Sequence, residues 1–443
     1  MTDGLIELTA IEAAERIANG DISAEEYTSA CLDRIAEVDD KVHAFVHLDR
    51  DEALRQARAL DERRRNGGSL GLLHGIPVGI KDIFDTADYP TECGSPMLKG
   101  RLPMRDCTAV ARLREAGAVI IGKTVTTEFA YLHPGPTRNP RDLERTPGGS
   151  SSGSAAAIAA GMVPLAIGSQ TNGSVIRPAA FCGVYGCKPT HGTISRHGAL
   201  VLSHPLDHVG TFTRSLADTA LILEALAGYD PEDSDTRPVA APAFLERVGE
   251  EPPMPPRFAF VPTPVWDKAD AEARAAIETL VARLGERAQA ISLGESFSSA
   301  WDDHRVIMAT DMAHNLKVVL ERGEGASSKA LRDFLLEGSK VPAVRYLAAR
   351  DAAKRYRDGI AEIFREYDAI IAPAAIGVAP KGEATGNPVF CSLWTLTGLP
   401  ALSLPLLTGE GGMPLGVQLI GERGDDARLL RTANWLVENL MGG

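Results

Sequence analysis

Two glycine-rich turns that carry serines constrain this 443-residue chain more than any other feature. Residues 148–154 read GGSSSGS, and residues 171–174 read TNGS. Ser174, at the end of the second turn, lies 24 positions after Ser150 in the first. One helix-like and one strand-like segment separate the turns, and this arrangement favours a shared active site over two structural turns.

A lysine ends an apolar run upstream of both turns. Residues 75–80 read GIPVGI, and Lys81 follows them. A serine hydroxyl is a poor nucleophile until a base takes its proton. Lysine can be that base only when it is neutral, and lowering its pKa from about 10.4 to about 7 costs roughly 4.6 kcal/mol. Because burial in apolar surroundings supplies a shift of this size, Lys81 with two serines predicts hydrolysis through a serine nucleophile without histidine.

Neighbouring residues fit this chemistry. Asp82 follows Lys81, but adjacent residues of a strand point to opposite faces, so its carboxylate need not neutralise the lysine pocket. Gly149 and Gly173 let backbone amides approach a tetrahedral oxyanion, where loss of one donor typically costs about 100- to 1,000-fold in rate. The two turns therefore have the small residues that an oxyanion site needs.

The composition is that of an ordinary globular protein, with 44% hydrophobic and 24% charged residues. A net charge of -13, from 46 basic and 59 acidic residues, predicts that neither nucleic acid nor an anionic membrane is a partner. The sequence shows no signal peptide and no apolar run of about 18 residues. Six cysteines without a Cys-x-x-Cys pair argue against structural zinc, and reduced thiols indicate a cytoplasmic protein.

Strand-like and helix-like segments alternate along the chain, which predicts an α/β sheet with crossover connections. Capping boxes at Thr9 with Glu12 and at Ser23 with Glu26 open two helices near the N-terminus. Further helices are expected at about 51–65, 110–116, 154–160 and 269–284, and strands at 76–80, 118–121, 163–167, 258–261, 367–373 and 402–406.

We expect one domain over residues 1–443. It divides into a helical N-terminal arm (1–66), a core (67–236) and a C-terminal part of the same sheet (257–443), with a proline-rich connector between residues 237 and 256. The sequence shows no internal repeat.

The order of several short motifs resembles that of the amidase signature family of serine amidohydrolases. Each motif is weak alone, but their order is specific and spans most of the chain. The motifs are Lys81-Asp82, Glu128-Phe129-Ala130, residues 148–154, residues 171–174, residues 181–184 (FCGV), Lys188-Pro189-Thr190, residues 367–373, residues 397–400 (TGLP) and residues 414–418 (PLGVQ).

The resemblance implies the family's fold, a large mixed twisted β-sheet covered by helices on both faces. It also implies a triad in which Lys81 is the base, Ser150 the bridging serine on a cis peptide, and Ser174 the nucleophile. The implied reaction cleaves a small carboxamide through an acyl-serine intermediate, without metal or cofactor, and a homodimer is left open. The implied oxyanion hole consists of the backbone amides of Thr171, Asn172, Gly173 and Ser174.

The chain departs from the family pattern around the second turn. Gln170 stands where an aspartate is common, Asn172 replaces a small residue, and Arg177 lies three positions after Ser174 instead of two. In the first turn, Ser152 replaces a glycine. The second-turn variant looks like a branch that includes malonamidase-type enzymes.

The changed residues of the second turn bear on how the substrate is recognised. The fork of Arg177 could hold a substrate carboxylate, such as that of malonamate, in two-point fashion, although a structural salt bridge fits Arg177 equally well. Ser151 is a second candidate for substrate binding.

Three alternatives remain open. Within the family, the chain could be the amidase subunit of a tRNA-dependent amidotransferase, with partner chains and a glutamine ammonia source; the altered segment 170–177 and the lack of a basic surface signal argue against it. A non-catalytic binding protein could keep the fold without the chemistry, but the retained triad argues against that. The third alternative is catalysis by a serine paired with a histidine. The candidate histidines are His191, His197, His204 and His208, but no matching acid motif accompanies them.

Overall fold

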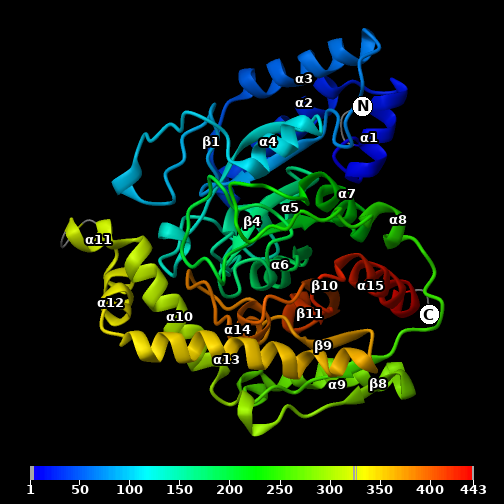
Figure 1. The fold of residues 1–443 in the computed structure, drawn as a ribbon. Helices are drawn as coiled ribbons and strands as arrows, with labels where there is room; N and C mark the ends of the chain where they lie inside the picture. Colours follow the sequence, from blue (N-terminus) through cyan, green and yellow to red (C-terminus); the bar gives the residue numbers. More distant parts are fainter. Residues whose placement is uncertain (1–3, 323–324, 326, 442–443) are drawn as a thin grey trace.

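Eleven strands of the computed structural model join into one mixed sheet, in the order β1-β3-β2-β4-β6-β5-β10-β11-β9-β7-β8. Figure 1 shows the N-terminal helices at one end of the molecule, at the top of the view, and helices from the second half of the chain at the other. The structure describes residues 4–322, 325 and 327–441. The strands are β1 (Phe45–Leu48), β2 (Pro77–Lys81), β3 (Val119–Thr124), β4 (Leu165–Gln170), β5 (Tyr185–Lys188), β6 (His208–Thr213), β7 (Phe258–Phe260), β8 (Ala288–Ala290), β9 (Ala369–Pro373), β10 (Ala401–Thr408) and β11 (Pro414–Ile420).

Helices pack on both faces of this sheet. On β11, a Cβ atom at Gly416 would meet Ala180 of α6, and α15 also contacts this strand. The helices are α1 (Ala10–Asn19), α2 (Ala24–Val42), α3 (Arg50–Arg65), α4 (Thr108–Glu115), α5 (Ser152–Ala159), α6 (Ile176–Cys182), α7 (Leu216–Leu226), α8 (Phe244–Val248), α9 (Ala271–Leu284), α10 (Ala300–Asn315), α11 (Lys317–Glu321), α12 (Lys329–Gly338), α13 (Ala343–Ala361), α14 (Val389–Leu396) and α15 (Asp426–Met441). The fold is the predicted α/β architecture.

The pairing of β2 determines where polar residues meet. This strand runs parallel to both β3 and β4, with Ile80 opposite Ile167 of β4. The carboxyl ends of parallel strands lie at the same edge of a sheet, where α/β proteins bind ligands. Lys81 ends β2 and Gln170 ends β4, so both residues lie at this edge.

Most expected elements are present, with shifted bounds. Both capping boxes are confirmed, with the Glu12 and Glu26 carboxylates each accepting a hydrogen bond from the backbone of the capping residue. Strand β4 continues three residues beyond the expected end at Ile167, because it pairs with β6 as far as Gln170 opposite His208. This pairing is long-range, so local sequence does not reveal it.

All three expected segments of the chain contribute to the sheet. The segment 1–66 is not purely helical, because it supplies β1, which pairs with β3. The segment 67–236 supplies β2 to β6, and the C-terminal segment supplies β7 to β11. The proposed division at these boundaries remains a prediction. Within the residues that the structure describes, no helix is both long enough and apolar enough to cross a membrane.

Candidate active site

Lys81 lies at the end of β2, completely buried. Its Nζ atom donates to the Oγ atom of Ser150 at 2.7 Å and to the Oγ atom of Ser169 at 2.8 Å. Burial lowers the pKa of this lysine well below its usual value, and the Asp207 carboxylate opposes the shift. Because Lys81 forms no ion pair within the described residues, its surroundings favour the neutral amine.

Ser150 lies directly before α5, at the end of the long connection from β3. The Gly149–Ser150 peptide bond is cis. Gly149 is closely surrounded, since a Cβ atom there would lie 2.8 Å from Thr385 and 3.0 Å from Thr127. A side chain at this position would have to displace Thr385 or Thr127, so the close packing beside Ser150 favours glycine.

The second turn, residues 171–174, connects β4 to α6, and Gln170 holds it in place. The Oε1 atom of Gln170 accepts hydrogen bonds from the backbone N–H groups of Val175 at 2.8 Å and Ile176 at 3.0 Å. Its Nε2 atom donates to the hydroxyl of Thr395, which in turn donates to the Asn172 carbonyl at 2.6 Å. Gln170 is therefore a buried brace for the turn.

The backbone N–H groups of residues 171–174 are available to a ligand. None of them donates to a protein acceptor within the described part of the chain. At Gly173, a Cβ atom would lie 2.8 Å from Pro388 and 3.1 Å from the sulfur of Cys391. The close packing and the unused donors fit an oxyanion site.

Ser174 is half-buried and lines a pocket of about 310 Å³. The pocket is also lined by Arg177 and by residues of α10, α12 and α14. Helix α10 contributes Trp301, and α14 contributes Ser392, whose hydroxyl donates to the side chain of Asn172. No hydrogen bond joins Ser174 to Ser150 or Lys81 in the described chain, so the structure connects only two of the three predicted triad members directly.

Arg177 lies on α6, buried beside both turns. Its Nη2 atom donates to the carbonyl of Gly149 at 2.6 Å, whereas Nε and Nη1 have no hydrogen-bond partner in the described residues. Burial lowers the pKa of this guanidinium to about 10, so it is charged at neutral pH. It makes no salt bridge in the described chain. A buried cation with unused donors on a pocket wall fits an anionic substrate group.

Ser151, the other candidate for substrate binding, does not line this pocket. Its hydroxyl donates to the Ser169 carbonyl and accepts from the Ser169 N–H group, both at 3.2 Å. Its position therefore suits bracing of β4 and not substrate contact.

Ser169 and Asp207 were missed from the sequence. Ser169 is the last residue but one of the strand that leads into the Ser174 turn, and parallel pairing with β2 could have placed it near Lys81. Asp207 is 36 residues beyond Thr171 and has no local signal. It accepts from the Thr171 hydroxyl at 2.6 Å and from the N–H groups of Leu202 and Ser203.

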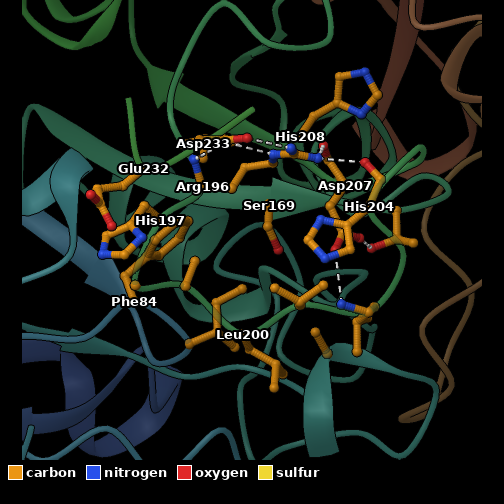
Figure 2. A pocket seen from close by; sticks show the side chains of 18 of the residues that line it. Phe84, Ser169, Arg196, His197, Leu200, His204, Asp207, His208, Glu232 and Asp233 are labelled. Carbon is orange, nitrogen blue, oxygen red and sulfur yellow. Dashed lines mark hydrogen bonds and ion pairs between the residues drawn. The ribbon is translucent and has the colours of Figure 1, made fainter. Parts of the chain in front are cut away.

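A second cavity, of about 180 Å³, lies on the Ser169 side (Figure 2). Figure 2 shows Ser169 in the middle of the view, with Arg196 and Asp207 beside it. Three of the four candidate histidines, His197, His204 and His208, line this cavity. No imidazole ring of the described histidines is hydrogen-bonded to a serine hydroxyl, which leaves the serine–histidine alternative without a pair.

A family model described as Amidase matches residues 26–430. The chain belongs to the amidase family. The fold and the motif order expected from the amidase signature are thus confirmed, and the chain is an amidase-type enzyme that acts on carbon–nitrogen bonds.

Curated relatives of this amidase include a subunit of glutamyl-tRNA(Gln) amidotransferase from Acidothermus cellulolyticus, which is 36% identical over 471 residues and aligns with 96% of this chain and 93% of its own length. A solved structure described as "An unexpected vestigial protein complex reveals the evolutionary origins of an s-triazine catabolic enzyme" has a TM-score of 0.91 at 31% identity, covering 98% of both chains. Peptide amidase from Stenotrophomonas maltophilia has a TM-score of 0.82 at 28% identity, covering 98% of this amidase and 97% of that chain.

The expectation that nucleic acid is no partner was wrong. Relatives that match nearly the whole amidase are named as subunits of an amidotransferase of glutamyl-tRNA(Gln), which conflicts with that exclusion. Net charge is a sum over the whole surface, so it reveals neither local basic clusters nor what partner chains contact.

Proposed function

We propose that this chain cleaves the carboxamide of a small substrate through an acyl-Ser174 intermediate, with Lys81 and Ser150 relaying the proton. One observation supports the proposal above all: the buried Nζ atom of Lys81 lies 2.7 Å from the Ser150 hydroxyl. Burial favours the neutral amine that can accept a proton. Ser174 lies on the turn with unused backbone donors, at the wall of the 310 Å³ pocket.

In the proposed reaction, Ser174 Oγ attacks the amide carbon while its proton passes to Ser150, and the Ser150 proton passes to Lys81. The N–H groups of residues 171–174 would hold the oxyanion of the tetrahedral adduct. When the C–N bond breaks, a proton returns from Lys81 through Ser150 to the leaving ammonia or amine. Water then attacks the acyl-Ser174 ester by the same relay and releases the acid.

The buried guanidinium of Arg177 supports a substrate that carries a carboxylate as well as a carboxamide. Its unused Nε and Nη1 donors could form charge-assisted hydrogen bonds with that carboxylate. Malonamate and glutamine both have the two groups. The comparisons give malonamate no support.

A role as the amidase component of an amidotransferase is better supported than a malonamate amidase. Curated relatives at 36% to 38% identity, over 96% to 97% of the chain, are named as a component of glutamyl-tRNA(Gln) amidotransferase. The family resemblance implies glutamine as the ammonia source for such a component. Six free, buried cysteines support a reducing, cytoplasmic location for it.

Ammonia release tests this proposal. The purified chain, alone and with co-expressed partner chains, is assayed with glutamine, malonamate and an uncharged amide of similar size. We expect glutamine to be the preferred substrate and Ser174→Ala to abolish turnover. Substantial activity of pure Ser174→Ala would contradict the assignment of Ser174 as the nucleophile. A clear preference for malonamate would contradict only the proposed role in an amidotransferase.

Labelling separates this enzyme from a non-catalytic binding protein with the same fold. A serine-directed fluorophosphonate should attach to the wild-type chain at Ser174, as located by peptide mass spectrometry, and should not attach to Ser174→Ala. Absence of labelling in a folded wild-type chain that also releases no ammonia would favour the binding protein.

A further inference from the structure

Two adjoining hollows away from the Ser174 pocket are lined by positive side chains. One has a volume of about 460 Å³ and the other about 240 Å³, and both are bordered by Arg423, His191 and Asp235. Neither shares a lining residue with the Ser174 pocket. We call the combined hollow the arginine groove; its cationic residues are Arg237, Arg350, Lys354, Arg357 and Arg423.

Four of these cations have no carboxylate partner among the described residues. Arg237, Arg350, Arg357 and Arg423 form no ion pair there, whereas Lys354 pairs with Asp351 at 3.1 Å. Arg357 donates through Nε to the Thr397 carbonyl at 2.9 Å. The Nε atom of Arg423 is buried and has no hydrogen-bond partner in the described chain.

The carboxylates that border the arginine groove are already engaged. Asp235 accepts from the guanidinium of Arg196 at 2.5 Å. Asp426 is buried and accepts from the backbone N–H group of Thr190 at 2.7 Å and from its hydroxyl at 2.5 Å. The partners of Asp426 are neutral, so its charge still acts on Arg423, but five cationic side chains line the groove against two carboxylates, which leaves positive charge for a ligand.

Arg237, Arg357 and Arg423 also act on one another. Burial lowers the pKa of Arg423, and the charges of Arg357 and Arg237 lower it further, while Asp426 and Asp235 oppose the shift. Burial lowers the pKa of Arg357 as well, with Asp358 opposing and Arg237 adding to the shift. Repulsion and lost hydration make such a cluster costly without an anion, although the chain as a whole has a net charge of -13.

We propose that the arginine groove binds a ligand through a phosphate group. The planar guanidinium fork matches phosphate oxygens two at a time, and several arginines on one hollow suit a group that carries more than one negative charge. The phosphate could belong to a free phosphorylated compound or to an RNA backbone. The groove lies apart from Arg177, so this site is distinct from the substrate pocket of the proposed function.

Calorimetric titration of the full chain with inorganic pyrophosphate tests the groove. We expect saturable binding that weakens as the salt concentration rises. Arg237→Gln and Arg423→Gln should each weaken binding by about 10-fold or more. Arg355→Gln is the matched control, because Arg355 is an exposed arginine of α13 that borders neither hollow, and it should bind as the wild type does.

Competition distinguishes the two phosphate sources. Displacement of pyrophosphate by tRNA would assign an RNA backbone, and displacement by a nucleoside triphosphate without displacement by tRNA would assign a free compound. No saturable binding to the wild type, or an equal loss in Arg355→Gln and Arg237→Gln, would overturn the proposal. Arg237 is exposed, so its replacement keeps the test valid if Arg423→Gln fails to fold.

Discussion

The Nζ atom of Lys123 lies 3.0 Å from the Oδ1 atom of Asp82, and both side chains are buried. Asp82 also accepts from the backbone N–H group of Glu92. The carboxylate that follows Lys81 in the sequence is therefore paired with a different lysine. This arrangement lets a neutral amine and a carboxylate occupy adjacent positions at one strand end, as alternation along a strand predicts.

Breaking this pair should destabilise the protein. Lys123→Met leaves the Asp82 carboxylate buried without its cation, and loss of one partner of a buried pair costs about 3 to 5 kcal/mol. Urea denaturation measures the change in the free energy of unfolding. In the double variant Lys123→Met/Asp82→Asn the loss should be smaller than the sum of the two single losses, and strict additivity would mean that the pair is not coupled.

The sequence predicted the parts of this site that depend on local pattern or motif order. Lys81, Ser150 and the glycines around them are recognisable because each stands in a short motif. Gln170 looked like a mere departure from the family pattern, since its brace depends on Thr395, which lies 225 residues away. Asp207 escaped notice for the same reason, because contacts between distant segments have no signature in either segment alone.

Activity should rise with pH. Lys81 accepts a proton only when neutral, so kcat/KM should increase as pH rises through its pKa, which burial places well below the usual 10.5. Lys81→Arg should be inactive throughout, because arginine keeps its proton. Measured pH profiles of ammonia release test both points. Near-normal rates in Lys81→Arg would rule out the relay.

Asp207 should influence the position of that pH profile. Its negative charge raises the pKa of Lys81, so Asp207→Asn should lower that pKa further and move the midpoint of the profile toward lower pH. Glu232→Gln serves as a control, because Glu232 borders the same cavity and is exposed. An unchanged midpoint, or a shift toward higher pH, would contradict the coupling between Asp207 and Lys81.

Replacement of Gln170 should loosen the turn that carries Ser174. In Gln170→Ala, the N–H groups of Val175 and Ile176 lose their acceptor, and each unsatisfied buried donor costs about 1 to 3 kcal/mol. We expect lower stability together with a reduced kcat. Gln170→Glu keeps an acceptor for both N–H groups and should recover part of the kcat; a full rate in Gln170→Ala would show that the brace is dispensable.

Arg177 gives the sharpest test of substrate choice. If its unused donors hold a carboxylate, Arg177→Met should lower activity on glutamine by about 10- to 150-fold, corresponding to a charge-assisted hydrogen bond of about 1.5 to 3 kcal/mol. The loss on an uncharged amide of similar size should be much smaller, and Arg177→Lys should restore part of the activity on glutamine. Because Arg177 also holds the Gly149 carbonyl at 2.6 Å, its loss could instead displace Ser150. Equal losses on the charged and uncharged substrates would show that Arg177 acts as a scaffold residue. They would contradict the proposed preference for a carboxylate but not the proposed amidase chemistry.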